Sequence, residues 1–197
     1  MTVADEAIIP KDFDEKLSKH LSCPIYFPVN HATISLAFQS FLRFTELSEA
    51  VKNEIDYRVC KTHRRGDIGY KKREPSDGLY RDSKEFFHYH PSIMELYPEF
   101  IESQPVLKEF LLQADSIYQH VEKTVKSILM HFESNHPGAH DKIFTTKNGE
   151  RTHILLRFLK YQWTTSGKYL AKPHFDSGSM TLASLDCALV AAKKIFS

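Results

Sequence analysis

The stretch that decides the fold reads KPHFDSGSMTL, from Lys172 to Leu182. Successive side chains of a β-strand point to opposite faces, so His174 and Asp176 would project from one face toward the same point. An imidazole and a carboxylate placed in this way are two of the three ligands in the 2-His-1-carboxylate triad that holds non-haem Fe(II). The alternative is a structural histidine followed by an aspartate that caps a turn.

The bare His-x-Asp pattern is weak evidence. With 11 histidines and 25 acidic residues in 197 positions, roughly one to two matches to His-x-Asp/Glu are expected by chance. The pattern also occurs elsewhere in the chain, for example at His131-Phe132-Glu133. That match falls in a predicted helix, where positions i and i+2 do not share a face, so it is set aside as a chelate. The first match therefore depends on its context.

Composition indicates a globular protein of one domain, or one large domain with a helical part. The chain has 197 residues, of which 42% are hydrophobic, enough to bury a full core. Its 26 basic and 25 acidic residues leave a net charge of +1. This balance gives no electrostatic case for a nucleic-acid partner or an acidic membrane surface.

The predicted location is cytoplasmic. Cys23, Cys60 and Cys187 are widely spaced and odd in number, which favours free thiols in a reducing compartment. The first ten residues lack the positive charge and apolar run of a signal peptide. No apolar window approaches the length of about 18 residues that a membrane span needs.

Apolar periodicity predicts helices in the first three quarters of the chain. We expect a short helix at 13–21, an extended segment at 23–29, a long helix at 30–57, a second long helix at 105–132 and a further helical turn or two at 139–146. Residues 62–78 are charged and contain glycine and proline, which predicts a solvated loop, with an anion site as the alternative. His88 and His90 have strand spacing, so they are either metal ligands or packed or half-exposed histidines among aromatic neighbours.

The pattern changes at Arg151. Residues 151–161 predict a strand with Leu155, Arg157, Leu159 and Tyr161 on one face. A second strand at 169–176 carries the His-x-Asp pair, and a third follows at 179–185. The alanines and paired lysines of residues 186–197 favour a short helix.

These passages together resemble the core of the isopenicillin N synthase-like 2-oxoglutarate/Fe(II)-dependent dioxygenases. In that family a strand of the type R-L-x-x-Y precedes an H-x-D strand, which continues into a G-x-x-T-L stretch; this chain has RFLKY at 157–161 and HFDSGSMTL at 174–182. Gly69-Tyr70 followed by DSKEF at 82–86 resembles the family's upstream GY and D-x-K-E passages. The resemblance covers most of residues 23–185 and is sharpest over 151–185.

The resemblance implies an α+β fold in which long N-terminal helices pack on a jelly-roll (double-stranded β-helix) core. Residues 1–150 would be the mainly helical region and 151–197 the incomplete start of the jelly roll. His174 and Asp176 match the family's first two iron ligands. Tyr161 matches a tyrosine that hydrogen-bonds 2-oxoglutarate, although a packed strand-end tyrosine fits equally well because Gln162 and Trp163 replace the family's usual proline and cysteine.

The end of the chain departs from the family pattern. The family's second histidine ligand and the arginine that pairs with 2-oxoglutarate follow the H-x-D motif at a distance, whereas the 21 residues after Asp176 contain neither histidine nor arginine. We therefore expect a chain that stops before the strands that close the jelly roll, with weakly held iron. A third ligand from His88, His90 or His153 would require an unusual rearrangement.

Three functions remain open from the sequence. The first is an oxidoreductase of this dioxygenase class, using Fe(II) and 2-oxoglutarate, with ascorbate as a possible addition, on a small-molecule substrate. The second is a non-catalytic remnant or partner-binding protein of the same fold. The third is an unrelated α+β binding module with an accidental H-x-D pattern. The sequence indicates neither the substrate nor the oligomeric state.

Overall fold

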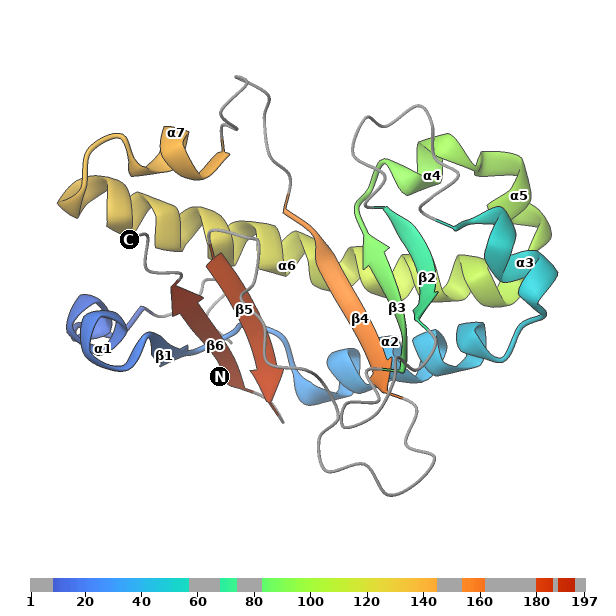
Figure 1. Cartoon of the computed structure of the whole chain (residues 1–197), viewed down its shortest axis with the longest axis horizontal. Coiled ribbons are helices and arrows are strands. Elements are labelled where there is room, and N and C mark those ends of the chain that lie inside the picture. The colour runs from blue at the N-terminus through green and yellow to red at the C-terminus, as the bar shows by residue number, and fades with distance from the viewer. Residues whose placement is uncertain are drawn as a thin grey trace. The chain divides into compact units, whose positions relative to one another are not determined.

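The fold belongs to the α+β class, as the sequence predicts (Figure 1). The structure is a computed structural model, and it describes residues 9–56, 68–73, 83–144, 154–161, 180–185 and 188–193. The chain divides into two compact units, of which the first comprises 1–31, 119–154 and 174–197, and the second 32–118 and 155–173. Each unit contains one three-stranded antiparallel sheet, and neither sheet closes into a barrel within the described residues.

The second unit combines helices with the sheet β2-β3-β4, in which β3 is the central strand (Figure 1). Its strands are β2 (Gly69–Arg73), β3 (Lys84–Tyr89) and β4 (Leu156–Tyr161). Its helices are α2 (His31–Thr45), α3 (Glu49–Glu54), α4 (Ile93–Leu96), α5 (Pro98–Ser103) and the first part of α6 (Pro105–Asn135).

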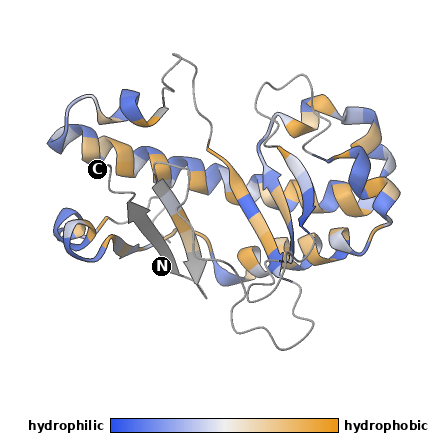
Figure 2. Ribbon diagram, viewed as in Figure 1, coloured by the Kyte–Doolittle hydropathy of each residue, from blue (hydrophilic) through white to orange (hydrophobic). Residues whose placement is uncertain are grey.

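Aromatic side chains form the core of this unit. Phe44 of α2 and Phe110 of α6 stack with ring centroids 5.4 Å apart. Both rings meet Phe87 of β3 edge-on, at 5.5 Å and 5.0 Å. Phe158 of β4 meets Phe110 at 5.1 Å. The helices supply such residues because hydrophobic and hydrophilic positions alternate along α2 and α6 (Figure 2), so each helix turns an apolar stripe toward the sheet.

The first unit contains the sheet β1-β6-β5 together with α1 (Phe13–His20), the last part of α6, and α7 (Ala139–Phe144) (Figure 1). Phe13 in α1 is fully buried and lies 5.5 Å from the ring of His131 and 5.7 Å from that of Phe132 on α6. The Asp14 carboxylate accepts a 2.7 Å hydrogen bond from the Asn135 side chain. The elements are α1 (Phe13–His20), β1 (Ser22–Ile25), the last part of α6, α7 (Ala139–Phe144), β5 (Met180–Leu185) and β6 (Ala188–Lys193).

Several predicted elements are confirmed by the structure. The helices expected at 13–21, 105–132 and 139–146 correspond to α1, α6 and α7, and the strand expected at 179–185 corresponds to β5. No helix in the described part of the chain is both long and apolar enough to cross a bilayer.

Three predictions of local structure are wrong. The helix expected at 30–57 is two helices, because Ser48 begins α3 with its side chain accepting a hydrogen bond from the Val51 amide at 3.4 Å. Part of the loop expected at 62–78 is β2, which pairs with β3 along its whole length. The helix expected at 186–197 is replaced by β6, because pairing with both β1 and β5 outweighs the helix preference of its alanines.

We expect Phe110→Ala to lower the free energy of unfolding by about 3–5 kcal/mol, the usual cost of removing a buried aromatic ring. Phe110 is fully buried and contacts rings from α2, β3 and β4. The matched control is Leu112→Ala on the same helix, where the side chain is 52% exposed and the change should stay within about 0.5 kcal/mol. Urea unfolding of both variants measures the difference, and equal effects would contradict this assignment of the core.

Candidate functional site

Three sequence passages singled out above become neighbouring strands of the β2-β3-β4 sheet. Gly69-Tyr70 begins β2, residues 84–86 of DSKEF begin β3, and RFLKY ends β4. The register pairs Tyr70 with Phe87, and Lys84 with Tyr161. Residues that are up to 92 positions apart in the sequence (Gly69 to Tyr161) therefore share one small sheet, which is the best-defined candidate site in the described residues.

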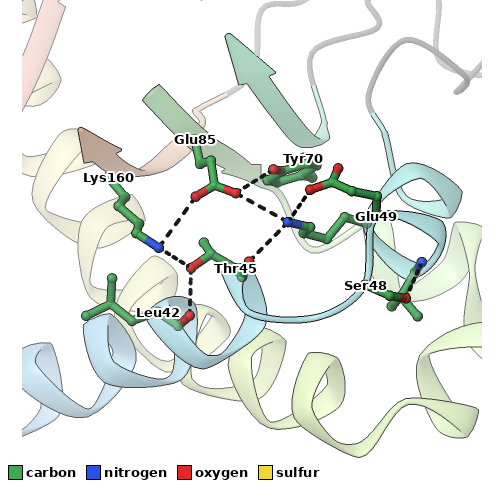
Figure 3. Close-up of polar contacts among 9 residues, drawn as sticks. Leu42, Thr45, Ser48, Glu49, Tyr70, Glu85 and Lys160 are labelled. Carbon is green, nitrogen blue, oxygen red and sulfur yellow. Dashed lines mark hydrogen bonds and ion pairs between the residues drawn. The ribbon is translucent and has the colours of Figure 1, made fainter. Parts of the chain in front are cut away.

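One face of this sheet buries a carboxylate within a cluster of cations (Figure 3). Glu85 of β3 is 4% exposed. Its Oε1 accepts a 2.7 Å hydrogen bond from the Tyr70 hydroxyl and lies 3.4 Å from Lys52 Nζ. Its Oε2 lies 3.5 Å from Lys160 Nζ. Both carboxylate oxygens are therefore satisfied by partners on three other elements, and we call these four residues the Glu85 cluster.

Each lysine of the Glu85 cluster has further acceptors. Lys52 Nζ donates to the Thr45 carbonyl oxygen at 3.0 Å and pairs with the Glu49 carboxylate at 2.8 Å. Lys160 Nζ donates to Thr45 Oγ1 at 2.8 Å. The break between α2 and α3 makes this possible, because Thr45 ends α2 and Lys52 of α3 reaches both its carbonyl oxygen and Glu85 of β3. Figure 3 shows Thr45 close to Glu85 and Lys160.

The surroundings of Glu85 keep it ionised. Burial by itself raises the pKa of the carboxyl group, but the hydrogen bond from Tyr70 and the charges of Lys52 and Lys160 outweigh burial and place the pKa below its ordinary value. Burial also raises the pKa of Tyr70, and its hydrogen bond to Glu85 raises it further, so the phenol stays protonated and donates. The cluster thus holds a fixed anion between fixed cations.

The opposite face of the sheet has a different character. Successive side chains of a strand point to opposite faces, so every second residue of β2, β3 and β4 lies on this face. We call it the basic face. Its three cross-strand rows follow from the register: Gly69, His88 and Arg157; then Lys71, Phe86 and Leu159; then Arg73, Lys84 and Tyr161. None of the described strand positions on the basic face is acidic.

Arg157 and His88 form a pair at one end of the basic face. Arg157 Nε donates a 2.7 Å hydrogen bond to His88 Nε2, so the proton of the neutral imidazole is on Nδ1. The guanidinium lies 5.7 Å from the centre of the Phe86 ring, and that ring lies 5.0 Å from the imidazole. The lone pair that His88 Nε2 would need to bind a metal is therefore used by Arg157.

Tyr161 lies at the other end of the basic face. Its ring receives Lys84 Nζ at 5.6 Å from the centroid, a cation–π contact between cross-strand partners. The side chain is half-buried and lies at the end of β4. The structure thus places this predicted co-substrate residue beside a lysine.

Other histidines considered from the sequence have structural contacts. His90 Nδ1 lies 2.8 Å from Ser92 Oγ and accepts from the Ser92 amide at 3.2 Å, just before α4. His131 contacts Asp14, while the Glu133 carboxylate accepts amide hydrogen bonds from Gly138 and His140. His88 and His90 are both half-buried among aromatic rings, which agrees with the packed or half-exposed alternative.

The predicted iron ligands His174 and Asp176 lie outside the described residues, as does His153. Within the part of the chain that is described, no three histidine, cysteine, aspartate or glutamate side chains come together to hold a metal ion. The described residues therefore include the basic face and, on the opposite face of the sheet, the Glu85 cluster, and they do not by themselves form a metal centre.

Sequence reasoning did not find the Glu85 cluster. Glu85 stands between Lys84 and Phe86, in a run in which polar and apolar residues do not alternate regularly. Lys52 belongs to a segment that was expected to be one continuous helix. The available signal was a single acidic residue at an inward strand position, with lysines opposite it on both neighbouring strands, Lys72 and Lys160. That signal can be recognised only when the pairing of the strands is known.

Comparison of the chain with models of known protein families, with curated proteins and with solved structures finds no match.

We expect Glu85→Gln to destabilise the protein at pH 7 by about 3 kcal/mol, the lower end of the usual cost of breaking a buried ion pair. The change removes the carboxylate beside the buried Lys52, which keeps Glu49 as a partner, and beside the half-buried Lys160. The folded-state pKa of Glu85 is lowered, so its stabilising effect is present above the unfolded pKa of about 4.3 and is lost as the pH falls through the folded value. The difference between the wild type and the variant should therefore shrink at about pH 3.

The matched control is Glu109→Gln, which removes a carboxylate that pairs with Arg43 on the surface, where it is 53% exposed. Its cost should stay below about 1 kcal/mol at either pH. Urea unfolding at the two pH values gives both comparisons. A pH-independent loss for Glu85→Gln would show that packing, and not ionic pairing, accounts for its effect.

Proposed function

We propose that the chain is an Fe(II)- and 2-oxoglutarate-dependent oxygenase that oxidises a small molecule, and that its basic face is the wall against which co-substrate and substrate bind. The single observation that carries the proposal is the strand register, which places the three family-like passages side by side. In this proposal the two sheets belong to a jelly-roll core and the helices to the N-terminal region of the dioxygenase fold.

His174 and Asp176 would hold the metal ion in this proposal, as the resemblance implies. Iron would supply the oxidising chemistry when it is bound. The described residues would act around it: Tyr161 would donate its hydroxyl proton in a hydrogen bond to a carboxylate of 2-oxoglutarate, and Lys84 beside it would add a positive charge. Phe86 and Leu159 would exclude water from the middle of the face.

The alternative is a non-catalytic protein of the same ancestry that binds a partner. One observation favours it: Phe38 and Leu42, one turn apart on α2, are 41% and 42% exposed, and Leu36 of the same helix is 53% exposed. Exposed apolar residues at helical spacing are typical of helix docking.

Incubation of the chain with Fe(II), ascorbate and 2-oxoglutarate distinguishes the two proposals. Succinate formation supports the oxygenase, and its absence from folded, iron-loaded protein supports the alternative.

Metal binding is tested by titrating the chain with Co(II) and following its visible absorption. We expect His174→Ala to weaken Co(II) binding by at least tenfold, since it removes one of the two proposed protein ligands. The control is His136→Ala, which removes an exposed histidine of the first unit and should leave binding unchanged. Equal weak binding by the wild type and by His174→Ala would remove the metal role of this residue.

The role of Tyr161 is tested by the variant Tyr161→Phe, which keeps the ring over which Lys84 lies and removes only the hydroxyl group. Loss of one hydrogen bond worth about 1 kcal/mol should raise the Kd for 2-oxoglutarate roughly three- to tenfold. Calorimetric titration of 2-oxoglutarate into the Co(II)-loaded chain measures this change. Tyr26→Phe, at a tyrosine that is 46% exposed, is the control, and unchanged affinity in Tyr161→Phe would assign the tyrosine to packing alone.

A further inference from the structure

Helix α6 carries two buried polar atoms in the first unit. Among the described residues, His120 Nδ1 and Thr124 Oγ1 are buried side-chain atoms that have no hydrogen-bond partner. Thr124 is fully buried, and His120 is half-buried. The two residues are four positions apart on a helix, so their side chains lie on the same face. One face of α6 therefore holds two polar groups that the described part of the chain does not use.

The hydroxyl group of Thr124 differs from its neighbours on the same helix. Ser127 donates to the Lys123 carbonyl oxygen at 3.1 Å, and Ser134 donates to the Met130 carbonyl oxygen at 3.0 Å. A bond to the preceding turn is the usual choice of a hydroxyl group within a helix, but Thr124 does not make it with any described residue. Because an unpaired buried polar group destabilises a fold, it indicates a bound ion, a bound water molecule or a chemical role.

The imidazole of His120 also differs from those of other described histidines. Four of these have a ring nitrogen within 3.5 Å of a polar side-chain atom: His88, His90, His131 and His140. The buried nitrogen of His120 has no such partner in the described chain. Its lone pair is therefore available in the tautomer that carries the proton on Nε2. A neutral imidazole nitrogen is the commonest metal ligand in proteins.

His120 belongs to the same compact unit as the proposed iron ligands, since the first unit includes residues 119–154 and 174–197. The 2-His-1-carboxylate triad needs one more histidine than His174 and Asp176 supply. An imidazole nitrogen without a partner is the donor that completes this set. The residues of this unit therefore fit the metal ion that the resemblance implies.

We propose that His120 is the third protein ligand of the iron, through Nδ1, and that the Thr124 hydroxyl group donates to an oxygen atom bound to the same ion. The inference rests on the proposed function for the identity of the other two ligands. Thr124 is then a positioning residue, because a donor of this kind orients a carboxylate or water ligand. This arrangement gives both buried atoms a partner and supplies the histidine that the sequence lacks after Asp176.

Titration of the full chain with Co(II), followed by visible absorption, tests the ligand role of His120. We expect His120→Ala to weaken Co(II) binding at least tenfold, as we expect of His174→Ala, since each removes one of three protein ligands. The control is His136→Ala, at an exposed histidine of the same unit, which should leave the affinity unchanged.

The two histidine variants separate this inference from the proposed function. A loss of Co(II) affinity in His174→Ala but not in His120→Ala would overturn the inference and leave the proposed metal role of His174 intact. Unchanged binding in both variants would contradict both. A loss in His120→Ala alone would also contradict both, because the two residues would then not share one metal ion.

Nitrogen-15 NMR of the histidine rings in the wild-type chain gives a second measurement, which does not depend on the folding of His120→Ala. Zn(II) serves as the diamagnetic probe. On its addition, the chemical shift of His120 Nδ1 should change and the ring proton should remain on Nε2. An unchanged His120 ring in the zinc-saturated chain would overturn the proposal and assign the buried nitrogen to a bound water molecule.

The role of Thr124 is tested by Thr124→Val, which keeps the branched shape of the side chain and removes the hydroxyl group. We expect about tenfold weaker Co(II) binding, while the metal-free variant resists urea at least as well as the wild type, because it loses an unpaired buried polar group. Ser127→Ala removes a hydroxyl group that bonds within its own helix, so it is the matched control and should leave Co(II) affinity unchanged. Unchanged affinity in Thr124→Val, or an equal loss in Ser127→Ala, would overturn the role of Thr124.

Discussion

The second unit depends on the burial of the Glu85 carboxylate. Removing an ion from water costs several kcal/mol, and this cost is offset only where geometry and hydrogen bonding are good. Here the compensating groups are the Tyr70 hydroxyl, Lys52 and Lys160. They come from β2, α3 and β4, so the carboxylate is stabilised only when all three elements are in place around β3.

This requirement fixes the register of the sheet. A slip of one residue in β3 would turn Glu85 to the opposite face and bring Lys84 or Phe86 inward. The Glu85 carboxylate would then lose its cations, and Phe87 would leave the rings of Phe44 and Phe110. Ionic pairing and aromatic packing therefore select the same register. The composition of the basic face follows from that selection, since each inward residue determines which neighbours point outward.

The amphipathic helices were predictable from the sequence, because their period is local and strong; α6 is the best example. Elements that depend on distant partners were not. β2 is a run of glycine, tyrosine and three basic residues that reads as a loop until β3 pairs with it, and β6 reads as a helix until β1 and β5 enclose it. At the candidate site, the sequence singled out Tyr161 and placed Arg157 on the same strand face, but the Glu85 cluster required pairings between residues 75 positions apart (Glu85 to Lys160).

The same reasoning limits what net charge says about ligands. A balance of 26 basic and 25 acidic residues argues against a partner that covers the whole surface. It does not describe one face of one sheet, because alternation along strands can sort charges of opposite sign to opposite faces without changing their sum. In this chain β3 sorts Glu85 inward and Lys84 outward from adjacent positions. Net charge alone therefore does not describe the charge that one face of a sheet carries.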